Sequence, residues 1–443
     1  MIEWPSDYST EDTQDPLQRR TPFIGRTAAF ARLSQVLNTS HSGALMYIGA
    51  EGVGKTALLY AIDQHMTVNQ IGVGVFIPLE SLPTHKNELA LALYQAAYGA
   101  LIADRGIAAL PSRLPTPPIN DDVIPDWMQW LADTGLPGIR HAMRPGRRLI
   151  FLLDDAQVWM DAIEQKLLSA DFPAVLAGMI APHSDTITLV FTVDQDEEQR
   201  LKLLAPLIQP EHTMRLTQLT EDEIHTAFTE ERAAHDLYRW TGGHAELIAA
   251  YLRIESPRKL SINHIESMTP LVYSRHQAVF QRWWEGLSPQ ERRVLTAIST
   301  AQYIDPFKAV TAAEIQAWLV QTEHPMDMTA IQAALRGLEY RELVVYDAGT
   351  ARGVRLKSDL FRRWLREHGG FDTAESADRP NAARLGGLAS VGNLSRQQMT
   401  MVGIGVVVVL ALILIVVLTT PAPENDGRNE AAMPTVTLAA PTP

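Results

Sequence analysis

The residues whose types and spacing point most clearly to chemistry lie between Gly49 and Thr56, where the sequence reads Gly-Ala-Glu-Gly-Val-Gly-Lys-Thr. This run matches the pattern G-x-x-x-x-G-K-[ST] of a phosphate-binding loop, in which the lysine reaches the β- and γ-phosphates and the hydroxyl binds Mg²⁺. Glycine allows the backbone to curl so that successive N–H groups point at phosphate oxygens. We therefore expect a nucleotide to be bound by Gly49, Gly52, Val53, Gly54, Lys55 and Thr56, with Thr56 also a metal ligand.

Two carboxylates, Asp154 and Asp155, follow a short apolar run at residues 149–153. A buried strand that ends in a carboxylate beside a phosphate-binding loop is suited to Mg²⁺ coordination. Asp154 is the expected metal ligand, directly or through water, and Asp155 is the expected catalytic residue that orients the attacking water. Asp155 is one methylene shorter than the glutamate common in fast ATPases. The sequence therefore predicts a site for ATP and Mg²⁺ with slow hydrolysis.

Short apolar runs would position these motifs at one edge of a sheet. They occupy residues 44–48, 73–77, 149–153 and 187–191. Because helical stretches separate them, these runs indicate parallel strands buried on both faces. The residues that follow the phosphate-binding loop begin a helix, whose N-terminal dipole favours bound anions. The fold class we expect is an α/β P-loop NTPase with a parallel sheet, followed from about Leu216 by mostly helical structure.

The segment Thr21–Arg26 resembles the F-[IV]-G-R element that precedes the phosphate-binding loop in STAND-type and origin-recognition-type AAA+ ATPases. In that family the element lies against the nucleotide base, so the resemblance implies that Phe23 and Ile24 contact adenine. The strand that ends at Asp194 is similar to the family's sensor strand. This implies that Thr192 or Asp194 faces the γ-phosphate, and we take Thr192 as the catalytic candidate. The arginine often found there in STAND proteins is absent from this sequence.

The resemblance extends to a helical lid and covers residues 21–252. Thr220 and Glu223 form a capping box, which predicts a helix start from local chemistry alone. The run Trp240–Ala245 resembles the lid's G-G-H-P turn, with Ala245 in place of the usual proline. In the family this histidine approaches the phosphates, so His244 joins the expected nucleotide-binding residues. A histidine that simply caps the turn is the alternative.

Residues 287–368 carry helix-start signals followed by a hairpin pattern. Capping boxes at residues 288–291 and 311–314 begin two helices, and apolar residues at helical spacing mark a third over residues 331–338. Two short β runs within residues 343–356 and a final helix follow. Three helices and a hairpin make a winged helix-turn-helix, and the segment resembles the one that trails many STAND ATPase modules.

The end of this segment is basic. Between Ala351 and His368 six basic residues stand against two acidic ones, a local charge of +4 that would suit DNA phosphates. The expected recognition helix, however, mixes Arg336 and Arg341 with Glu339 and Glu342. The sequence leaves two functions open for the segment: DNA binding, or packing against the ATPase with a solvated basic face.

The composition changes near the C-terminus. Residues 401–418 are all apolar or glycine, and eighteen helical residues span about 27 Å, close to the thickness of a bilayer's hydrocarbon core. Arginines precede this run, whereas acidic residues dominate after it, which predicts that the N-terminal side stays in the cytoplasm. Composition predicts a flexible linker before the run and a disordered tail beyond the membrane.

Overall composition restricts the function further. Lys and Arg number 38 against 51 Asp and Glu, a net charge of −13, which argues against a protein that coats nucleic acid non-specifically. The absence of cysteine excludes disulfides, thiolate metal sites and cysteine nucleophiles. No secretory signal is visible at the N-terminus. The domains we expect are an N-terminal segment (1–20), an ATPase core (21–205), a helical lid (206–270), a winged helix-turn-helix (271–368), a flexible linker (369–400), a transmembrane helix (401–419) and a tail (420–443).

The leading hypothesis is a single-pass, membrane-anchored ATP-dependent switch of STAND/AAA+ type, with cytoplasmic N-terminal domains and an external tail, acting in signalling or regulated assembly. Its expected partners are ATP or ADP, the cell membrane, and either further copies of the chain or another protein. One alternative is a membrane-tethered DNA-binding regulator that uses the winged helix. Another is an ATPase that assists envelope or secretion assembly, although few residues remain beyond the span to form the external domain usual there.

Overall fold

A computed structural model describes residues 7–8, 23–38, 43–83, 85–105, 114–115, 126–347 and 353–370. Most of the N-terminal segment, residues 348–352 and the chain from residue 371 onward lie outside these ranges. The predicted linker (from residue 371), transmembrane helix (401–419) and tail (420–443) are therefore outside the described residues. Within the described residues, no helix is long and apolar enough to cross a membrane.

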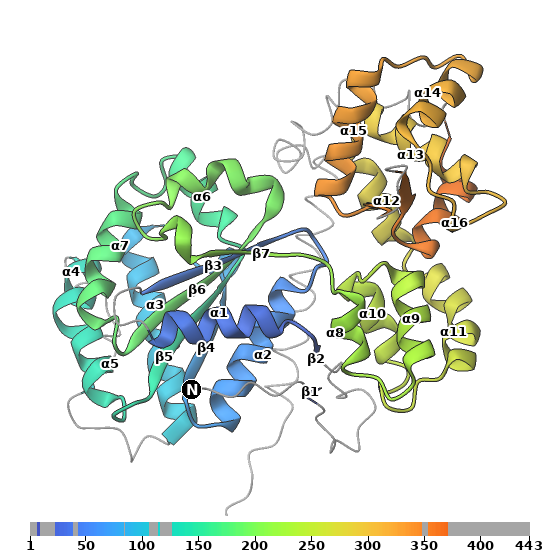
Figure 1. The fold of residues 1–443 in the computed structure, drawn as a ribbon. Helices are drawn as coiled ribbons and strands as arrows, with labels where there is room; N and C mark the ends of the chain where they lie inside the picture. Colours follow the sequence, from blue (N-terminus) through green and yellow to red (C-terminus); the bar gives the residue numbers. More distant parts are fainter. Residues whose placement is uncertain are drawn as a thin grey trace, which may run out of the picture. The chain divides into compact units, whose positions relative to one another are not determined.

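A five-stranded parallel sheet forms the centre of the first half of the chain (Figure 1). Its order is β4 (Gly72–Pro78), β5 (Arg148–Asp154), β6 (Ile187–Asp194), β3 (Ala44–Gly49) and β7 (Thr213–Leu216). Four of the strands contain the apolar runs predicted from the sequence. The fifth, β7, was not predicted, and it places residues assigned to the lid at the edge of the core sheet. Because all strands are parallel, their carboxyl ends share one edge.

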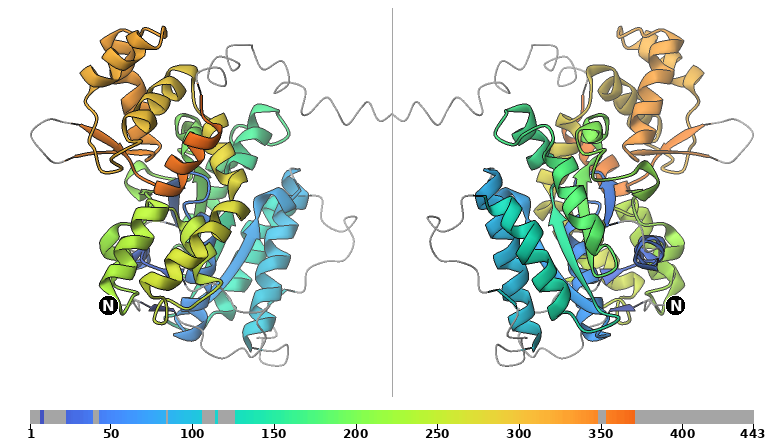
Figure 2. Two further views of the ribbon diagram at one scale, coloured as in Figure 1. Left: turned by 90° about the vertical axis from the view of Figure 1, so that its right-hand side faces the viewer. Right: turned by 90° about the vertical axis from the view of Figure 1, so that its left-hand side faces the viewer.

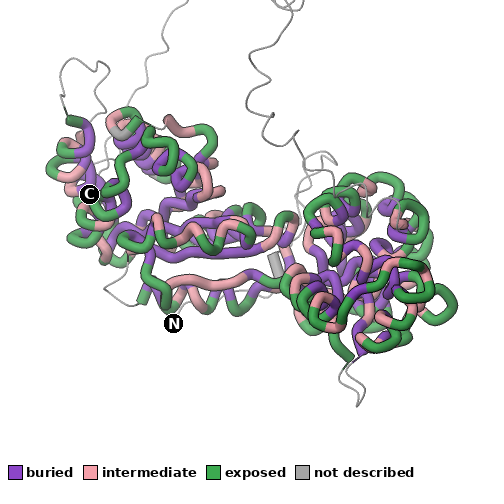
Figure 3. Tube along the Cα trace, turned by 90° about the horizontal axis from the view of Figure 1, so that it is seen from above, coloured by how far each residue is buried: buried purple, intermediate pink, exposed green. Residues whose placement is uncertain are grey.

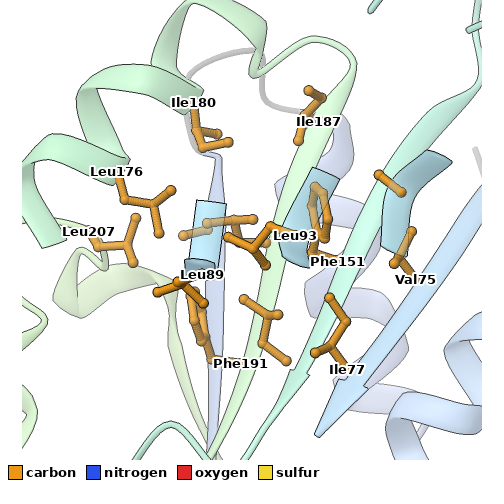
Figure 4. Packing of buried hydrophobic residues seen from close by; sticks show 14 of the residues in the cluster. Val75, Ile77, Leu89, Leu93, Phe151, Leu176, Ile180, Ile187, Phe191 and Leu207 are labelled. Atoms are coloured by element: carbon orange, nitrogen blue, oxygen red, sulfur yellow. The ribbon is translucent and has the colours of Figure 1, made fainter. Parts of the chain in front are cut away.

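Successive side chains on each strand point to opposite faces of the sheet, as the two-residue period of a strand requires. On β3, Leu45 and Tyr47 pack with the helices α1 (Thr27–Asn38) and α2 (Lys55–Val68). Ala44, Met46 and Ile48 belong to the core on the other face. Figures 1 and 2 show helices on both sides of the sheet. Figure 4 shows the core on the face of the sheet that includes Met46, where Phe151 and Phe191 lie among aliphatic side chains from strands and helices. Its helical segments are α3 (Lys86–Arg105), α4 (Trp127–Trp130), a π-helical turn (Leu131–Gly135), α5 (Leu136–Ala142), α6 (Gln157–Glu164) and α7 (Phe172–Ile180).

The described chain after β7 is mostly helical, with one later strand pair. The first four helices are α8 (Glu221–His225), α9 (Glu231–Thr241), α10 (Ala245–Leu252) and α11 (Ile262–Arg275). The boundary that we expected between residues 270 and 271 falls inside α11, so the chain is helical across it. One apolar cluster also joins lid residues such as Leu247 to Phe361 and Trp364 near the end of the described chain. Figure 3 shows buried residues on the inner sides of the helices and exposed residues outside.

The C-terminal elements appear in the predicted order. They are α12 (Gln277–Glu285), α13 (Pro289–Ala301), α14 (Ala312–Gln321), α15 (Met328–Tyr340), β8 (Val344–Tyr346), β9 (Val354–Leu356) and α16 (Asp359–His368). β8 and β9 form an antiparallel pair (Figure 2). The capping boxes that begin α8, α13 and α14 are all present, because each N-cap hydroxyl accepts the N3 amide while the N3 glutamate accepts the N-cap amide.

Candidate nucleotide site

The phosphate-binding loop runs from the end of β3 into the first turn of α2. Gly52 and Gly54 have φ values of 75° and 95°, which glycine adopts without steric cost. Gly54 is the N-cap of α2, and no side chain caps its amides. The first-turn N–H groups of a helix lack intrahelical partners and carry the positive end of its dipole. The loop and helix therefore present amide donors where an anion would bind.

Thr56 and Asp154 come together from positions 98 residues apart. The Thr56 hydroxyl donates to Asp154 Oδ2 over 2.6 Å. The other oxygen, Asp154 Oδ1, accepts the hydroxyl of Thr192. Asp154 is buried, yet both of its oxygens have donors, as a buried carboxylate requires. A threonine hydroxyl beside a carboxylate is a hard oxygen pair that fits Mg²⁺, whose remaining positions are usually filled by phosphate and water.

Asp155 lies just beyond β5 in an uncommon backbone conformation, with φ at 65°. Its N–H donates to the Thr192 hydroxyl over 3.0 Å, and its carboxylate accepts from Gln157 Nε2 over 3.0 Å. Burial raises the pKa of the Asp155 carboxyl, while the hydrogen bond from Gln157 lowers it. Residues held in such sparsely populated backbone conformations cluster at functional sites. The carboxylate is held in a fixed position beside Asp154.

Thr192 connects Asp154 to the backbone of Asp155. The residue is fully buried, and its hydroxyl donates to the Asp154 carboxylate and accepts the Asp155 N–H. Its position facing the γ-phosphate, which the resemblance implied, stays a prediction. The other candidate on this strand, Asp194, lies opposite Gly49 in the sheet register. Its carboxylate accepts from Lys55 Nζ over 2.5 Å.

Lys55 has further acceptors in the loop itself. Its ammonium lies 3.0 Å from the carbonyl oxygen of Gly49 and 3.1 Å from that of Ala50. The side chain is buried, whereas that of Asp194 is 40% exposed. A phosphate that approached Lys55 would therefore compete with Asp194 for the same ammonium. Sequence reasoning named both residues but could not pair them, because the pairing depends on β6 lying next to β3.

His244 packs against the loop from the first turn of α10. Its Nε2 lies 3.4 Å from the Glu51 carbonyl oxygen, and its ring meets Trp283 edge-on at 4.6 Å. The neighbouring Glu246 donates its N–H to the Gly52 carbonyl over 3.2 Å. A Cβ at Gly52 would lie 2.6 Å from the His244 ring. The histidine thus contacts the backbone of the phosphate-binding loop, and glycine at position 52 is required by this close approach.

Phe23 and Ile24 form β2 (Phe23–Ile24), which pairs with β1 (Asp7–Tyr8). Ile24 is buried with the apolar residues of the lid, and Phe23 meets Phe30 edge-on at 5.9 Å. Ile24 therefore packs against the helices that follow β7, and Phe23 packs against α1. Their expected contact with adenine stays a prediction.

Arg26 is a buried residue that we did not single out as part of the site. Its guanidinium donates to the Val53 carbonyl over 2.5 Å and to the Thr217 carbonyl. Its backbone N–H donates to Glu223 over 2.7 Å. Burial lowers the pKa of the guanidinium, and nearby Glu223 raises it. Arg26 thus joins the phosphate-binding loop to the start of the lid. The sequence signal that could have identified Arg26 as a site residue is its place as the arginine of the F-[IV]-G-R element.

Arg282 forms ion pairs with one residue of the phosphate-binding loop and one residue of α10. It lies 2.9 Å from the Glu51 carboxylate and 3.3 Å from that of Glu246. All three side chains are substantially exposed, so the ion pairs themselves add little stability. No sequence motif marks Arg282, which belongs to α12, more than 200 residues after the loop that it contacts. The link could be found only from the fold.

Folding should become less favourable as the pH falls below about 6.5, because of His244. Burial lowers the pKa of this histidine to about 3, whereas a histidine in an unfolded chain titrates near 6.5. Below pH 6.5 the unfolded chain binds a proton that the folded chain does not, so stability present above that pH is lost as the pH falls toward 3. At pH 5 the loss is about 2 kcal/mol.

Urea unfolding at pH 7.5 and pH 5.0 measures this effect. Between the two pH values, wild type should lose about 2 kcal/mol more than His244→Gln. The exposed His141 supplies the control, since His141→Gln should keep the wild-type difference. Equal losses in wild type and His244→Gln would contradict a histidine that is buried and neutral in the folded protein.

The parallel sheet, the loop between β3 and α2, and the carboxylate at the end of β5 decide the fold. It is that of an α/β P-loop NTPase. No protein-family model matches the sequence, and no curated protein matches it. Among solved structures, the chain is similar to a Walker-type ATPase of Pyrococcus abyssi, with 14% identity, a TM-score of 0.49, and coverage of 78% of this chain and 96% of the other.

Two origin-recognition structures are also similar. The ORC2 protein of Aeropyrum pernix has 15% identity and a TM-score of 0.46, covering 80% of this chain and 96% of the other. The Cdc6 protein of Pyrobaculum aerophilum has 13% identity and a TM-score of 0.33, with coverage of 80% and 97%. At these values the similarity assigns no ligand, partner or residue role to this chain.

Proposed function

We propose that this chain is a membrane-anchored ATP-binding switch of the STAND/AAA+ type that hydrolyses ATP slowly. The observation that carries the nucleotide part is the 2.6 Å contact between the Thr56 hydroxyl and Asp154. It brings together two oxygen ligands suited to one Mg²⁺, directly beside the amides of the phosphate-binding loop and Lys55. A buried carboxylate with this neighbour has no evident structural reason to end a core strand.

Each residue of the site has a distinct role in this proposal. The loop amides and Lys55 would bind the phosphates, and Thr56 with Asp154 would hold Mg²⁺. The metal would neutralise the charge that develops on the phosphates. Asp155 would accept a hydrogen bond from water and orient it, while Thr192 holds the Asp154 carboxylate and the Asp155 backbone in place. The short reach of Asp155 supports slow turnover.

Contacts between the lid and the loop support a switch rather than a simple binding protein. Arg26 joins Val53 to Thr217, and Glu246 donates its N–H to Gly52. A ligand shifts a conformational equilibrium only by its difference in affinity for the two states. Phosphates that bind the amides of residues 52–54 touch the same loop that the lid contacts. We infer that ATP and ADP favour different lid positions.

Calorimetric titration of the detergent-solubilised full chain tests the proposed nucleotide binding. ATP and ADP should bind in the presence of Mg²⁺, and removal of Mg²⁺ should weaken ATP binding most, because it removes the bridge to Thr56 and Asp154. Size-exclusion chromatography of the same samples would reveal nucleotide-dependent assembly. A protein that binds neither nucleotide at millimolar concentration would overturn the proposal.

DNA binding by the C-terminal helices receives less support. At the end of α15 the Tyr340 hydroxyl donates to Glu198 over 2.7 Å, and Glu342 accepts the N–H of Gln218 over 2.5 Å. Among the basic residues near α16, Arg362 pairs with Asp359 at 3.1 Å, and Lys357 lies 3.8 Å from Glu342. These contacts support the packing interpretation of the winged-helix segment.

We also propose that residues 401–419 anchor the chain in the cell membrane, with residues 21–368 in the cytoplasm. The support is the uninterrupted apolar run and the arginines before it. Protease added to inverted membrane vesicles should digest the large domains and spare an epitope placed after Pro443. Vesicles of the opposite orientation should show the reverse pattern.

Two controls make the topology experiment decisive. Detergent should expose every segment to protease in both vesicle types. Extraction with carbonate should leave the chain in the membrane pellet, because a transmembrane helix is held far more firmly than a surface helix or a single acyl chain. Release by carbonate would overturn the anchor, and an inverted protection pattern would overturn the orientation.

A further inference from the structure

An exposed apolar loop joins α13 to α14 in the C-terminal helical segment (Figure 1). Tyr303, Ile304 and Phe307 are all exposed, and the Ile304 side chain is 92% exposed. Single exposed apolar residues are ordinary, but three large ones within five positions form a patch, and such patches mark interaction sites. Among the described residues, no hydrogen bond or ion pair joins this loop to Lys55, Thr56 or the two carboxylates at the end of β5, so the proposed nucleotide site gives no reason for its composition.

A cleft of about 550 Å³ lies beside the loop, between α13 and α16. Ser299, Thr300 and Tyr303 line one side of it, and Arg363, Arg366 and the acidic Glu367 line the other. The Arg366 guanidinium lies over the Tyr303 ring, 4.2 Å from its centre. Among the described residues, no carboxylate lies within ion-pair distance of Arg366. The Thr300 hydroxyl already donates to the Thr296 carbonyl, and Arg363 is paired with Glu367, so Arg366 is the cation that the cleft offers to a bound anion.

The other charges around the loop are largely paired. Lys308 lies 3.3 Å from Glu314, and Arg363 lies 3.0 Å from Glu367. The carboxylate of Asp305 accepts the N–H of Phe307 over 3.0 Å and so stabilises the turn of the loop. Because these charges nearly cancel, a strongly charged partner is not favoured. DNA in particular would leave Ile304 and Phe307 without apolar contacts.

We propose that the loop Tyr303–Phe307 inserts its apolar side chains into the surface of a phospholipid bilayer, with a headgroup phosphate bound by Arg366. The chemistry fits: a tyrosine ring suits the interfacial layer, Ile304 and Phe307 suit the region just below it, and an arginine suits the phosphates. The inference rests on the proposed membrane anchor, because two inserted side chains alone give marginal and reversible binding.

The position of the cleft in the sequence, close to the predicted membrane span, also supports a phospholipid bilayer as the surface that the loop contacts. Gly369 also lines the cleft, and the predicted membrane span begins at Met401. A flexible linker of about 30 residues, as the sequence predicts, has an end-to-end distance of about 30 Å. The linker would thus keep the loop close to the bilayer, and this high effective concentration compensates for weak intrinsic affinity.

The chain has no cysteine, so Ile304→Cys provides a unique attachment point for an environment-sensitive fluorophore. The labelled full chain is reconstituted into phosphatidylcholine vesicles with or without a lipid that carries a spin-label quencher near its headgroup. The label at 304 should shift to shorter wavelength and lose at least half of its emission to the quencher. Replacing a fifth of the lipid with phosphatidylglycerol should change this result little, because the surrounding charges are paired.

Val320→Cys is the matched control. It is an exposed position near the far end of α14, about 12 Å along the helix from its start. Its label should be quenched little, although it belongs to the same segment and shares the same tether. Phe307→Ser and Arg366→Ala are each combined with Ile304→Cys and, in separate chains, with Val320→Cys. Both substitutions should reduce quenching at 304 at least twofold and leave the emission of the label at 320 unchanged.

The outcomes separate the loop from the anchor. Equal quenching at 304 and 320, or none at 304 in chains that float with the vesicles in carbonate, would overturn the loop proposal and leave the anchor intact. Chains that float only at neutral pH, with quenching at 304, would support the loop and overturn the anchor. A label at 304 that responds to duplex DNA instead of lipid would identify the patch as a nucleic-acid surface.

Discussion

Replacement of Lys55 by alanine is expected to remove most of the stabilisation that ATP gives to the folded chain. Lys55 lies in the loop and contacts Asp194 and two backbone carbonyls, so its charge is directed at the place where phosphates would bind. At a hundredfold excess of ATP over its dissociation constant, wild type should gain about 2.7 kcal/mol. If the substitution weakens binding about 100-fold, the gain at the same ATP concentration falls to about 0.4 kcal/mol.

The quantity to compare is the shift in melting temperature on addition of ATP and Mg²⁺. The melting temperature without nucleotide can change for a separate reason, because alanine leaves the carbonyls of Gly49 and Ala50 without their ammonium donor. Lys202→Ala removes an exposed lysine and should keep the full wild-type shift. Equal shifts in wild type and Lys55→Ala would show that the loop does not bind the phosphates of ATP.

The parts of the site that the sequence predicted are those fixed by neighbouring residues. The phosphate-binding loop combines eight consecutive positions, and its glycines, lysine and threonine occupy the expected strand–loop–helix context. The capping boxes likewise depend on residues three apart, such as Thr220 and Glu223, and each was found. Local chemistry of this kind does not depend on how distant segments pack, which explains why it is visible in one sequence.

Contacts set by strand order could not be predicted in the same way. Thr192 reaches Asp154 because β6 pairs with β5, and Asp194 reaches Lys55 because β6 also pairs with β3. The sequence gives the four main strands but not their order. The short strand β7 was missed because its Thr-Met-Arg-Leu sequence has little apolar signal. Arg282 on α12 reaches the loop through tertiary packing that no local pattern records, whereas Arg26 belongs to the F-[IV]-G-R element but its contacts with Val53 and Thr217 depend on the fold.

Two substitutions at the end of β5 should separate metal binding from hydrolysis. In Asp154→Asn, an NH₂ group replaces one of the two oxygens to which Thr56 and Thr192 donate, so one of these hydroxyls would face a donor instead of an acceptor. The neutral group is also a poor Mg²⁺ ligand. We expect ATP affinity in Asp154→Asn to become nearly independent of Mg²⁺, as measured by titration with and without a chelator.

Asp155→Asn should behave differently, because the amide oxygen can still accept from Gln157 while the negative charge that orients water is lost. ATP should bind with close to wild-type affinity, and the turnover rate should fall about 100-fold or more, the usual contribution of a positioned base. Asp161→Asn, an exposed carboxylate on the following helix, should leave both quantities unchanged. The reverse assignment, with Asp155→Asn losing Mg²⁺-dependent binding, would exchange the roles of the two carboxylates. Wild-type turnover in Asp155→Asn would remove this residue from the reaction, leaving Lys55, Thr56 and Asp154 as a site that binds nucleotide and uses a different group to position water.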